Sequence, residues 1–219
     1  MTTLPEPYSI LPSIESIARR AGAVIREATS RPRHIDFKGE VNLVTQTDHD
    51  SEALIVEALT VEFPGTAILA EESGAQPGSN GLTWVVDPLD GTNNFAHGYP
   101  VFAVSIALWA SDGPLAGVVY DPMRDECFSA ARGHGATLNG QPVRVSATQS
   151  LLHSILATGY PYDHHTALDA NTVASSAFLR RVQDLRRSGA AALDLASVAC
   201  GRLDGFWEMG LDPWDVGAG

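Results

Sequence analysis

Trp84-Val85-Val86-Asp87-Pro88-Leu89-Asp90-Gly91-Thr92-Asn93-Asn94-Phe95 is the stretch of this 219-residue chain that decides its fold. The apolar run from Trp84 to Val86 predicts a buried strand, and two carboxylates, Asp87 and Asp90, follow where the strand ends. Carboxylates are costly to bury unless a cation meets them, and oxygen ligands suit a hard divalent ion such as Mg²⁺. The stretch therefore predicts a metal site at a strand end.

The residues after Asp90 indicate an anion beside the metal. Gly91 lets backbone N–H groups approach an anion, and a helix that begins near Asn93 would favour a phosphate at its N-terminus. Metal ligands next to a phosphate-binding turn indicate metal-assisted phosphoryl chemistry. The alternative for each acid is a plain turn with an Asp cap, because Asp-Pro and Asp-Gly are common in turns.

Composition narrows the class of protein. Hydrophobic residues make up 44% of the chain, so a sizeable core is available, and the net charge of −12 argues against nucleic acid as a partner. The same charge conflicts with an anionic substrate unless bound cations reverse the local field. Two cysteines in apolar surroundings, no signal peptide and no long apolar run predict a cytoplasmic protein without membrane contact.

Hydrophobic periodicity divides the chain into two parts. Two amphipathic helices are expected over 14–28 and from Thr47-Asp48 to Phe63, where Thr47 and Asp50 fit a capping pattern, and residues 31–42 read as a loop or a short hairpin. Strands then dominate, with a hairpin turn at Asn139-Gly140, and predict one mostly antiparallel sheet. These strands are expected at 67–70, 84–86, 102–109, 115–120, 126–131, 136–138 and 143–145.

The last third of the chain alternates between strands and helices. The expected elements are a strand at 154–158, a helix at 168–182, a strand at 184–187, a helix at 190–200 and a strand at 204–208. This change predicts an N-terminal α+β half, residues 1–148, that carries the large antiparallel sheet and most metal ligands. Residues 149–219 would form a C-terminal α/β half.

Other acids and bases have the spacing to join the site. Glu71 follows an apolar strand, Asp48 stands at a helix start, and Asp215 belongs to Asp-Pro-Trp-Asp. A solvated acid or a helix cap is the alternative for each of them. Lys38 and Arg187 are candidate phosphate or substrate partners, although a surface position is the default for either.

Taken together, these residues resemble the inositol monophosphatase family of lithium-sensitive, Mg²⁺-dependent phosphatases. The most specific motifs of this resemblance are Asp87 to Phe95 and Trp214-Asp215-Val216-Gly217-Ala218-Gly219. The segments Val119 to Arg124 and Arg187-Ser188-Gly189 also support it. The resemblance covers essentially the whole chain and is closest to the bacterial branch. It implies an α+β fold, a layered α-β-α-β-α sandwich of the sugar-phosphatase type. Family members continue past the Trp-Asp motif, so part of the C-terminal half is expected to be missing here.

The resemblance also implies a role for each site residue. Glu71, Asp87 and the carbonyl of Leu89 would hold one Mg²⁺, and Asp87, Asp90 and Asp215 a second, with a third, weaker ion facing Glu71. Thr92 and Asp48 would orient and deprotonate the attacking water. The remaining contacts would be to substrate: the backbone N–H groups of Gly91 and Thr92 for phosphate, and Arg187, Gly189, Ala191 and Glu208 around the alcohol.

The implied activity is Mg²⁺-dependent hydrolysis of a small phosphorylated polyol or sugar, with inositol 1-phosphate favoured. Histidinol phosphate and fructose 1,6-bisphosphate are the alternative substrates. Asn93-Asn94 stand where nucleotide phosphatases of this family tend to carry a base and an acid, so that branch ranks lower. A non-catalytic or regulatory protein, with the transcription machinery as partner, is the alternative from another class. Homodimerisation is a family expectation.

Overall fold

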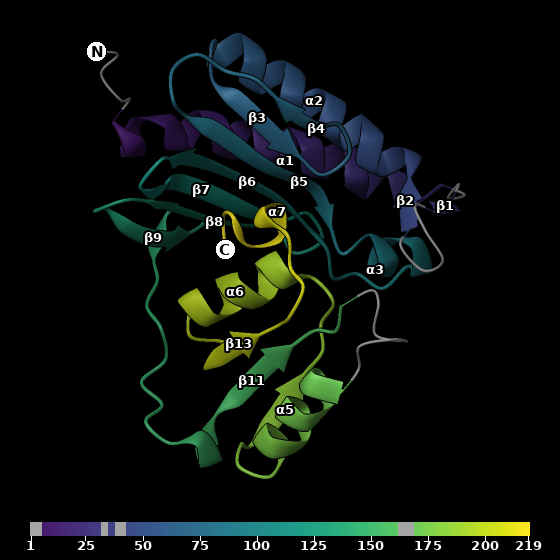
Figure 1. Ribbon diagram of the computed structural model, residues 1–219, viewed down its shortest axis with the longest axis vertical. Coiled ribbons are helices and arrows are strands. Elements are labelled where there is room, and N and C mark those ends of the chain that lie inside the picture. The colour runs from purple at the N-terminus through teal and green to yellow at the C-terminus, as the bar shows by residue number, and fades with distance from the viewer. Residues whose placement is uncertain (1–5, 32–34, 38–42, 162–168) are drawn as a thin grey trace.

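The structure is a computed structural model that describes residues 6–31, 35–37, 43–161 and 169–219. Its elements stack in five layers, in which two helices cover a large sheet, a third helix separates that sheet from a small one, and a fourth helix covers the small sheet (Figure 1). This arrangement confirms the predicted α-β-α-β-α sandwich. Lys38, a candidate substrate partner, lies outside the described residues.

Two long helices form the first layer. The short 3₁₀ turn η1 (Pro7–Ile10) leads into α1 (Leu11–Ala28), whose apolar residues at helical spacing are buried against the large sheet. The second helix, α2 (Gln46–Glu62), begins two residues earlier than predicted. Its N-cap is Thr45, which forms a capping box with Asp48, so the prediction of Thr47 and Asp50 as the capping pair was wrong. Both pairs fit the same four-residue pattern, and the sequence alone does not separate them.

The large sheet has eight strands in the order β10-β9-β8-β7-β6-β5-β3-β4. All neighbours are antiparallel except β3 and β5, which run parallel. The mostly antiparallel sheet expected from the sequence is therefore confirmed. Its strands are β3 (Ala67–Ala70), β4 (Gly74–Gln76), β5 (Thr83–Asp90), β6 (Ala103–Ala110), β7 (Gly113–Asp121), β8 (Glu126–Ala131), β9 (Gly135–Leu138) and β10 (Gln141–Pro142).

Two short segments next to this sheet refine the predictions. The strands β1 (Ile35–Phe37) and β2 (Leu43–Thr45) pair antiparallel, while most of the predicted loop or hairpin at residues 31–42 lies outside the described residues. The strand predicted at 143–145 is absent from this described stretch, because β10 ends at Pro142. One backbone bond still follows β10, from the N–H of Val143 to the carbonyl of Ala136 at 3.1 Å, but no further pairing with β9 is present in this described stretch. An irregular and largely exposed connector, residues 143–150, follows instead.

The C-terminal part of the chain supplies the other layers. A three-stranded parallel sheet has the order β12-β11-β13, and α5 packs on it through Phe178, whose ring lies 4.7 Å from that of Trp207. The buried helix α6 packs against the large sheet. The elements are η2 (Leu151–His153), β11 (Ile155–Thr158), α5 (Asp169–Leu179), β12 (Asp184–Arg186), α6 (Ala191–Ala199), β13 (Gly205–Trp207) and α7 (Pro213–Val216).

The parallel pair β3 and β5 determines where the acids meet. Because parallel strands run in the same direction, their carboxyl ends share one edge of the sheet. The N–H of Glu71 donates to the carbonyl of Val86 at 3.2 Å, so the turn after β3 lies beside Asp87. A register shift in β5 between Asp87 and Asp90 then redirects the chain into α3 (Thr92–His97).

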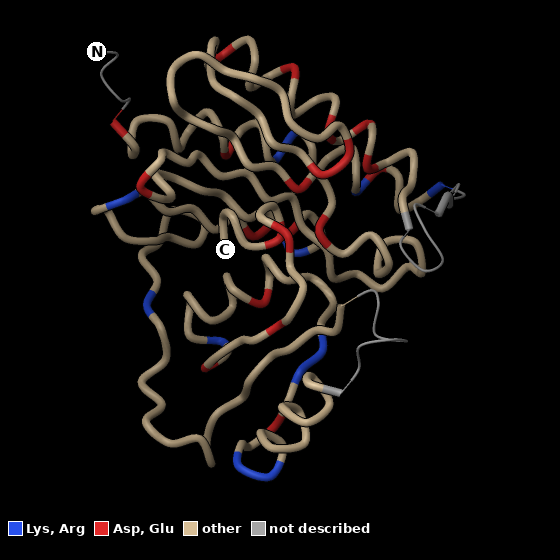
Figure 2. Tube along the Cα trace, in the orientation of Figure 1, with Lys and Arg blue, Asp and Glu red and all other residues tan. Residues whose placement is uncertain are grey.

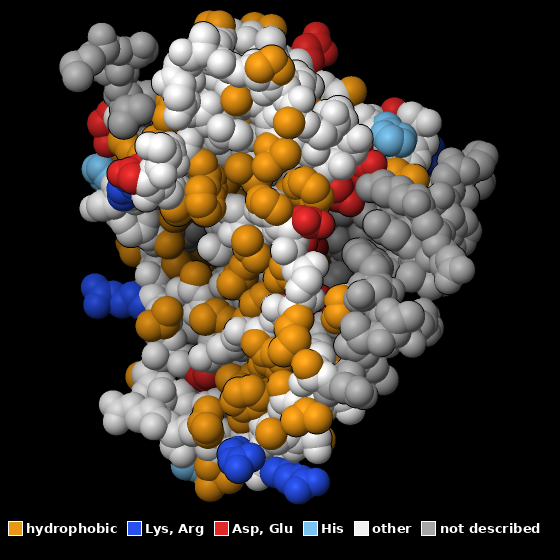
Figure 3. All heavy atoms as spheres, viewed as in Figure 1, with side chains coloured by type: hydrophobic (Ala, Val, Ile, Leu, Met, Phe, Trp, Pro, Cys, Tyr) orange, Lys and Arg blue, Asp and Glu red, His pale blue; other side chains and the backbone are white. Residues whose placement is uncertain are grey.

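One face of the molecule carries a run of hydrophobic side chains. Hydrophobic side chains gather along the middle of the face seen in Figure 3, from the edge of the large sheet down towards α5. Within the described residues, every helix is too short or too polar to cross a bilayer.

Candidate active site

A cavity of about 250 Å³ lies where β5 ends, between the large sheet and the C-terminal half of the chain. Acidic residues gather near the middle of the molecule, around α7 and the end of β5 (Figure 2). Of the candidate residues that the structure describes, all except Asp48 line the cavity, namely Glu71, Asp87, Leu89, Asp90, Gly91, Thr92, Arg187, Gly189, Ala191, Glu208 and Asp215.

Asp48 lies behind this wall, in contact with Thr92. It is fully buried, and its Oδ1 accepts a hydrogen bond of 2.9 Å from Thr92 Oγ1. Its Oδ2 accepts from the N–H and the hydroxyl of Thr45, at 2.8 and 2.6 Å. Burial raises the pKa of Asp48, and the hydrogen bonds from Thr45 and Thr92 oppose that rise. Asp48 is thus both a helix cap and the acceptor for a hydroxyl that lines the cavity.

Asp87 is a carboxylate whose charge is opposed both by burial and by three neighbouring acids. Its side chain is buried, and its Oδ1 accepts from the N–H of Leu89 at 3.0 Å. Burial first, and then the negative charges of Glu71, Asp90 and Asp215, hold the pKa of Asp87 well above its ordinary value. The charged form is therefore penalised by both solvent loss and repulsion, which a bound cation would relieve.

Asp90 connects the two halves of the chain. Its two carboxylate oxygens accept from the N–H groups of Ala191 at 3.1 Å and Ala192 at 2.8 Å, at the N-terminus of α6. Burial raises the pKa of Asp90 well above its usual value, although these two hydrogen bonds oppose the rise. The N-terminus of a helix favours a negative charge, so this placement partly offsets the cost of burial.

Asp215 and Glu208 enter the cavity from the last segments of the chain. Asp215 forms a capping box with Asp212 at the start of α7, and burial raises its pKa to about 6. Burial also raises the pKa of Glu208 to about 7, against the attraction of Arg187. The cap that the sequence offered as an alternative for Asp215 is present, and it does not conflict with a position in the cavity wall.

Two residues that the sequence did not single out, Tyr160 and Asp212, also line this cavity. Asn93 and Trp214, which belong to the two sequence motifs, line it as well. The Asn94 amide donates to the carbonyls of Val101 at 2.7 Å and Ser188 at 2.9 Å, so it joins α3 to the loop before α6. The sequence shows Asn94 two residues after Thr92, but its partners are distant along the chain.

The donor set fits hard divalent cations. Within the described residues, no three His, Cys, Asp or Glu side chains are already gathered in a metal-binding arrangement. Nevertheless, Glu71, Asp87, Asp90 and Asp215 surround one cavity together with Leu89, and the charges of the other three acids raise the pKa of Asp87. Oxygen-only donors of high negative charge are those that Mg²⁺ prefers.

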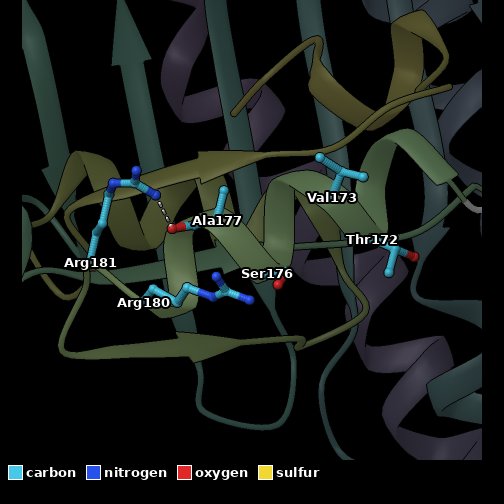
Figure 4. A pocket seen from close by; sticks show the side chains of 6 residues that line it. All are labelled: Thr172, Val173, Ser176, Ala177, Arg180 and Arg181. Atoms are coloured by element: carbon cyan, nitrogen blue, oxygen red, sulfur yellow. Dashed lines mark hydrogen bonds between the residues drawn. The ribbon is translucent and has the colours of Figure 1, made fainter.

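A second hollow lies along α5 and has a different character. It measures about 720 Å³ and is lined by Thr172, Val173, Ser176, Ala177, Arg180 and Arg181 (Figure 4). Arg181, in the turn after α5, donates to the carbonyl of Ala177 at 2.8 Å. Because no carboxylate lines this hollow, it lacks the donors of the acidic cavity, and the smaller cavity is the candidate active site.

These observations define a class of protein. Its members are layered α+β sandwiches with carboxylates around one cavity at the ends of the strands. The chain belongs to the inositol monophosphatase family, whose model matches residues 9–219. It is 50% identical over 202 residues to the inositol-1-monophosphatase of Synechocystis sp., covering 91% of this chain and 70% of that protein.

Two further relatives carry the name SuhB. The Nus factor SuhB of Haemophilus influenzae is 44% identical over 205 residues, which cover 92% of this chain and 77% of that protein. The crystal structure of the extragenic suppressor protein suhB from Bartonella henselae superposes with a TM-score of 0.90 at 40% identity. That match covers 96% of this chain and 82% of the other.

Proposed function

We propose that this protein is a Mg²⁺-dependent phosphomonoesterase that releases phosphate from a small polyol or sugar phosphate, with inositol 1-phosphate as the favoured substrate. The observation that carries the proposal is the single cavity that joins Glu71, Asp87, Asp90, Thr92 and Asp215. Membership of the inositol monophosphatase family and the name of the Synechocystis relative support it.

The carboxylates would hold two to three Mg²⁺ ions. Glu71, Asp87 and the carbonyl of Leu89 would hold one ion, Asp87, Asp90 and Asp215 a second, and Glu71 would face a third. When bound, such ions polarise a phosphate ester and lower the pKa of water. They would also offset the charge of −12, which otherwise opposes an anionic substrate.

The remaining residues would orient water and substrate. Thr92 Oγ1 lies 2.9 Å from Asp48 Oδ1, so the hydroxyl can accept a proton from an attacking water while it passes its own proton to Asp48. The N–H groups of Gly91 and Thr92 would hold the phosphate. Around the alcohol, Arg187 and Glu208 would contact hydroxyl groups, and the small residues Gly189 and Ala191 would leave room for the ring.

The test is phosphate release from inositol 1-phosphate with Mg²⁺ or with EDTA, by the native chain and Asp90→Asn. We expect release only with Mg²⁺ and a loss of at least about 100-fold in the variant, because one charged ligand disappears. Asp112→Asn, in the exposed turn between β6 and β7, is the matched control and should retain activity. Release that is independent of Mg²⁺, or unchanged in Asp90→Asn, would contradict the proposal. Histidinol phosphate and fructose 1,6-bisphosphate complete the substrate panel.

A regulatory role is the second candidate function, favoured by the 44% identity to the Nus factor SuhB. Binding of the purified chain to RNA polymerase, measured beside the phosphatase assay, separates the two functions. We also propose a homodimer, which light scattering after size exclusion tests directly.

A further inference from the structure

Helix α2 carries a buried polar stripe in addition to its apolar one. Asp48, Ser51 and Glu52 are 0%, 0% and 5% exposed, although they belong to a helix on the outer layer of the fold. Residues three and four apart lie on the same face of a helix, so the three side chains point in one direction. That direction is the edge of the large sheet where β3 and β5 end.

Each residue of the stripe contacts a different turn of the candidate site. Asp48 accepts from Thr92, as described above. Ser51 Oγ donates to the carbonyl of Pro88 at 2.8 Å, within the turn that carries Asp87 and Asp90. The helix therefore contacts the start of α3 and the acidic turn at the same time.

Glu52 contacts the third turn, which follows β3. One carboxylate oxygen accepts from the N–H of Glu72 at 2.8 Å, and the other accepts from the N–H of Ser73 at 2.8 Å. Both bonds are to the backbone immediately after Glu71. They complete the anchoring of this turn, because the N–H of Glu71 itself donates to Val86 in β5.

A buried carboxylate is a poor means of stabilising a fold. The desolvation of its charge opposes folding, although an apolar replacement at Glu52 would remove the acceptor of the Glu72 and Ser73 N–H groups. Two charge-assisted bonds to adjacent N–H groups, in contrast, fix a turn in one orientation. The geometry of Glu52 therefore suits the orientation of a neighbouring group better than it suits stability alone.

We propose that Glu52 is a positioning residue that fixes the turn after β3, so that the Glu71 carboxylate is held ready for a divalent cation. This inference rests on the proposed function, because it assigns Glu71 to the cation. Partners that orient a metal ligand typically change metal affinity by about 10–100-fold when they are removed.

The first measurement is hydrogen exchange of the metal-free protein, and it does not depend on metal or activity. In Glu52→Gln the side chain keeps one acceptor but directs an NH₂ group at the second N–H. We expect residues 71–74 to exchange faster in this variant, while the rest of β3 and β5 is unchanged. Glu57→Gln removes an exposed charge from the same helix and should leave this turn protected. Unchanged exchange in Glu52→Gln would overturn the proposal.

The second measurement is the Mg²⁺ dissociation constant by calorimetry, without substrate. We expect Glu52→Gln to weaken Mg²⁺ binding by about tenfold or more and Glu57→Gln to leave it unchanged. Glu52→Asp keeps the charge but is one methylene too short for both bonds. It should also weaken binding, and it replaces the Gln variant if that variant does not fold. Equal affinity in a native and a Glu52 variant overturns this inference alone, whereas a native protein that binds no Mg²⁺ overturns the proposed function as well.

Discussion

At the scale of single residues, the pair Thr92 and Asp48 can be tested most directly. We predict that Thr92→Ala lowers kcat by about 10²–10⁴-fold, because it removes the hydroxyl that relays a proton to Asp48. KM should change little, since the backbone N–H groups remain. Thr92→Ser keeps the hydroxyl and should restore most of the rate. Steady-state kinetics of both variants decide the point, and an inactive Ser variant would argue that the methyl group rather than the hydroxyl matters.

Residues also differ in how far the sequence reveals them. Asp87 and Asp90 could be singled out because acids rarely end a buried strand without a reason. Glu52 could not, because a glutamate in an amphipathic helix has the same pattern as a solvated one. The contacts of Asn94 were equally hidden, since its acceptors Val101 and Ser188 are brought near only by the fold. Interactions between distant segments leave no local pattern in the chain.

At the scale of elements, the junction of β5 and α3 depends on Gly91. Its φ is +93°, and a Cβ there would lie 2.9 Å from the carbonyl oxygen of Val101. We predict that Gly91→Ala destabilises the protein by about 1–3 kcal/mol and displaces Thr92, because both the backbone and the contact are strained. Denaturant unfolding and the phosphatase assay measure the two effects.

Gly133 provides a matched control for that experiment. Its φ is +83°, but a Cβ there would meet nothing within 4 Å. Gly133→Ala should therefore show the conformational cost alone and leave activity intact. If both alanine variants lose the same stability and the same activity, the close approach of Val101 has no role.

The strand β8 was predicted better than the start of α2, for a physical reason. β8 matches its predicted range of 126–131, because burial on both faces and flanking turns limit a strand on each side. The start of α2 was misplaced, because two overlapping Thr-x-x-Asp patterns compete and only the tertiary contact of Asp48 with Thr92 selects one.

At the scale of the whole molecule, the buried acids determine how stability depends on pH. Burial raises the pKa of Glu208 to about 7 and that of Asp194 to about 6, above their ordinary values of 4.5 and 3.8. A raised pKa in the folded state stabilises it at low pH, and this contribution is lost as pH rises through the folded pKa. In EDTA we predict that Tm falls between pH 5 and pH 8.

The decline should be shallower in Glu208→Gln, which cannot ionise at this position. Each kcal/mol corresponds to about 2–4 °C in a protein of this size, so calorimetry resolves the change. A Tm that rises steadily over this range would contradict the raised pKa values of Glu208 and Asp194.

The irregular connector at residues 143–150 has a consequence for how the protein is assembled. Within the described structure, it is largely exposed and contributes no side chain to the cavity. The halves meet instead through α6 against the large sheet and through Asp90 at the start of that helix. Two separately produced polypeptides, 1–148 and 149–219, should consequently bind each other and form one particle. The peptide bond between them would then not be required for the folded structure. Co-expression of the two fragments followed by affinity capture of one of them shows whether the other follows.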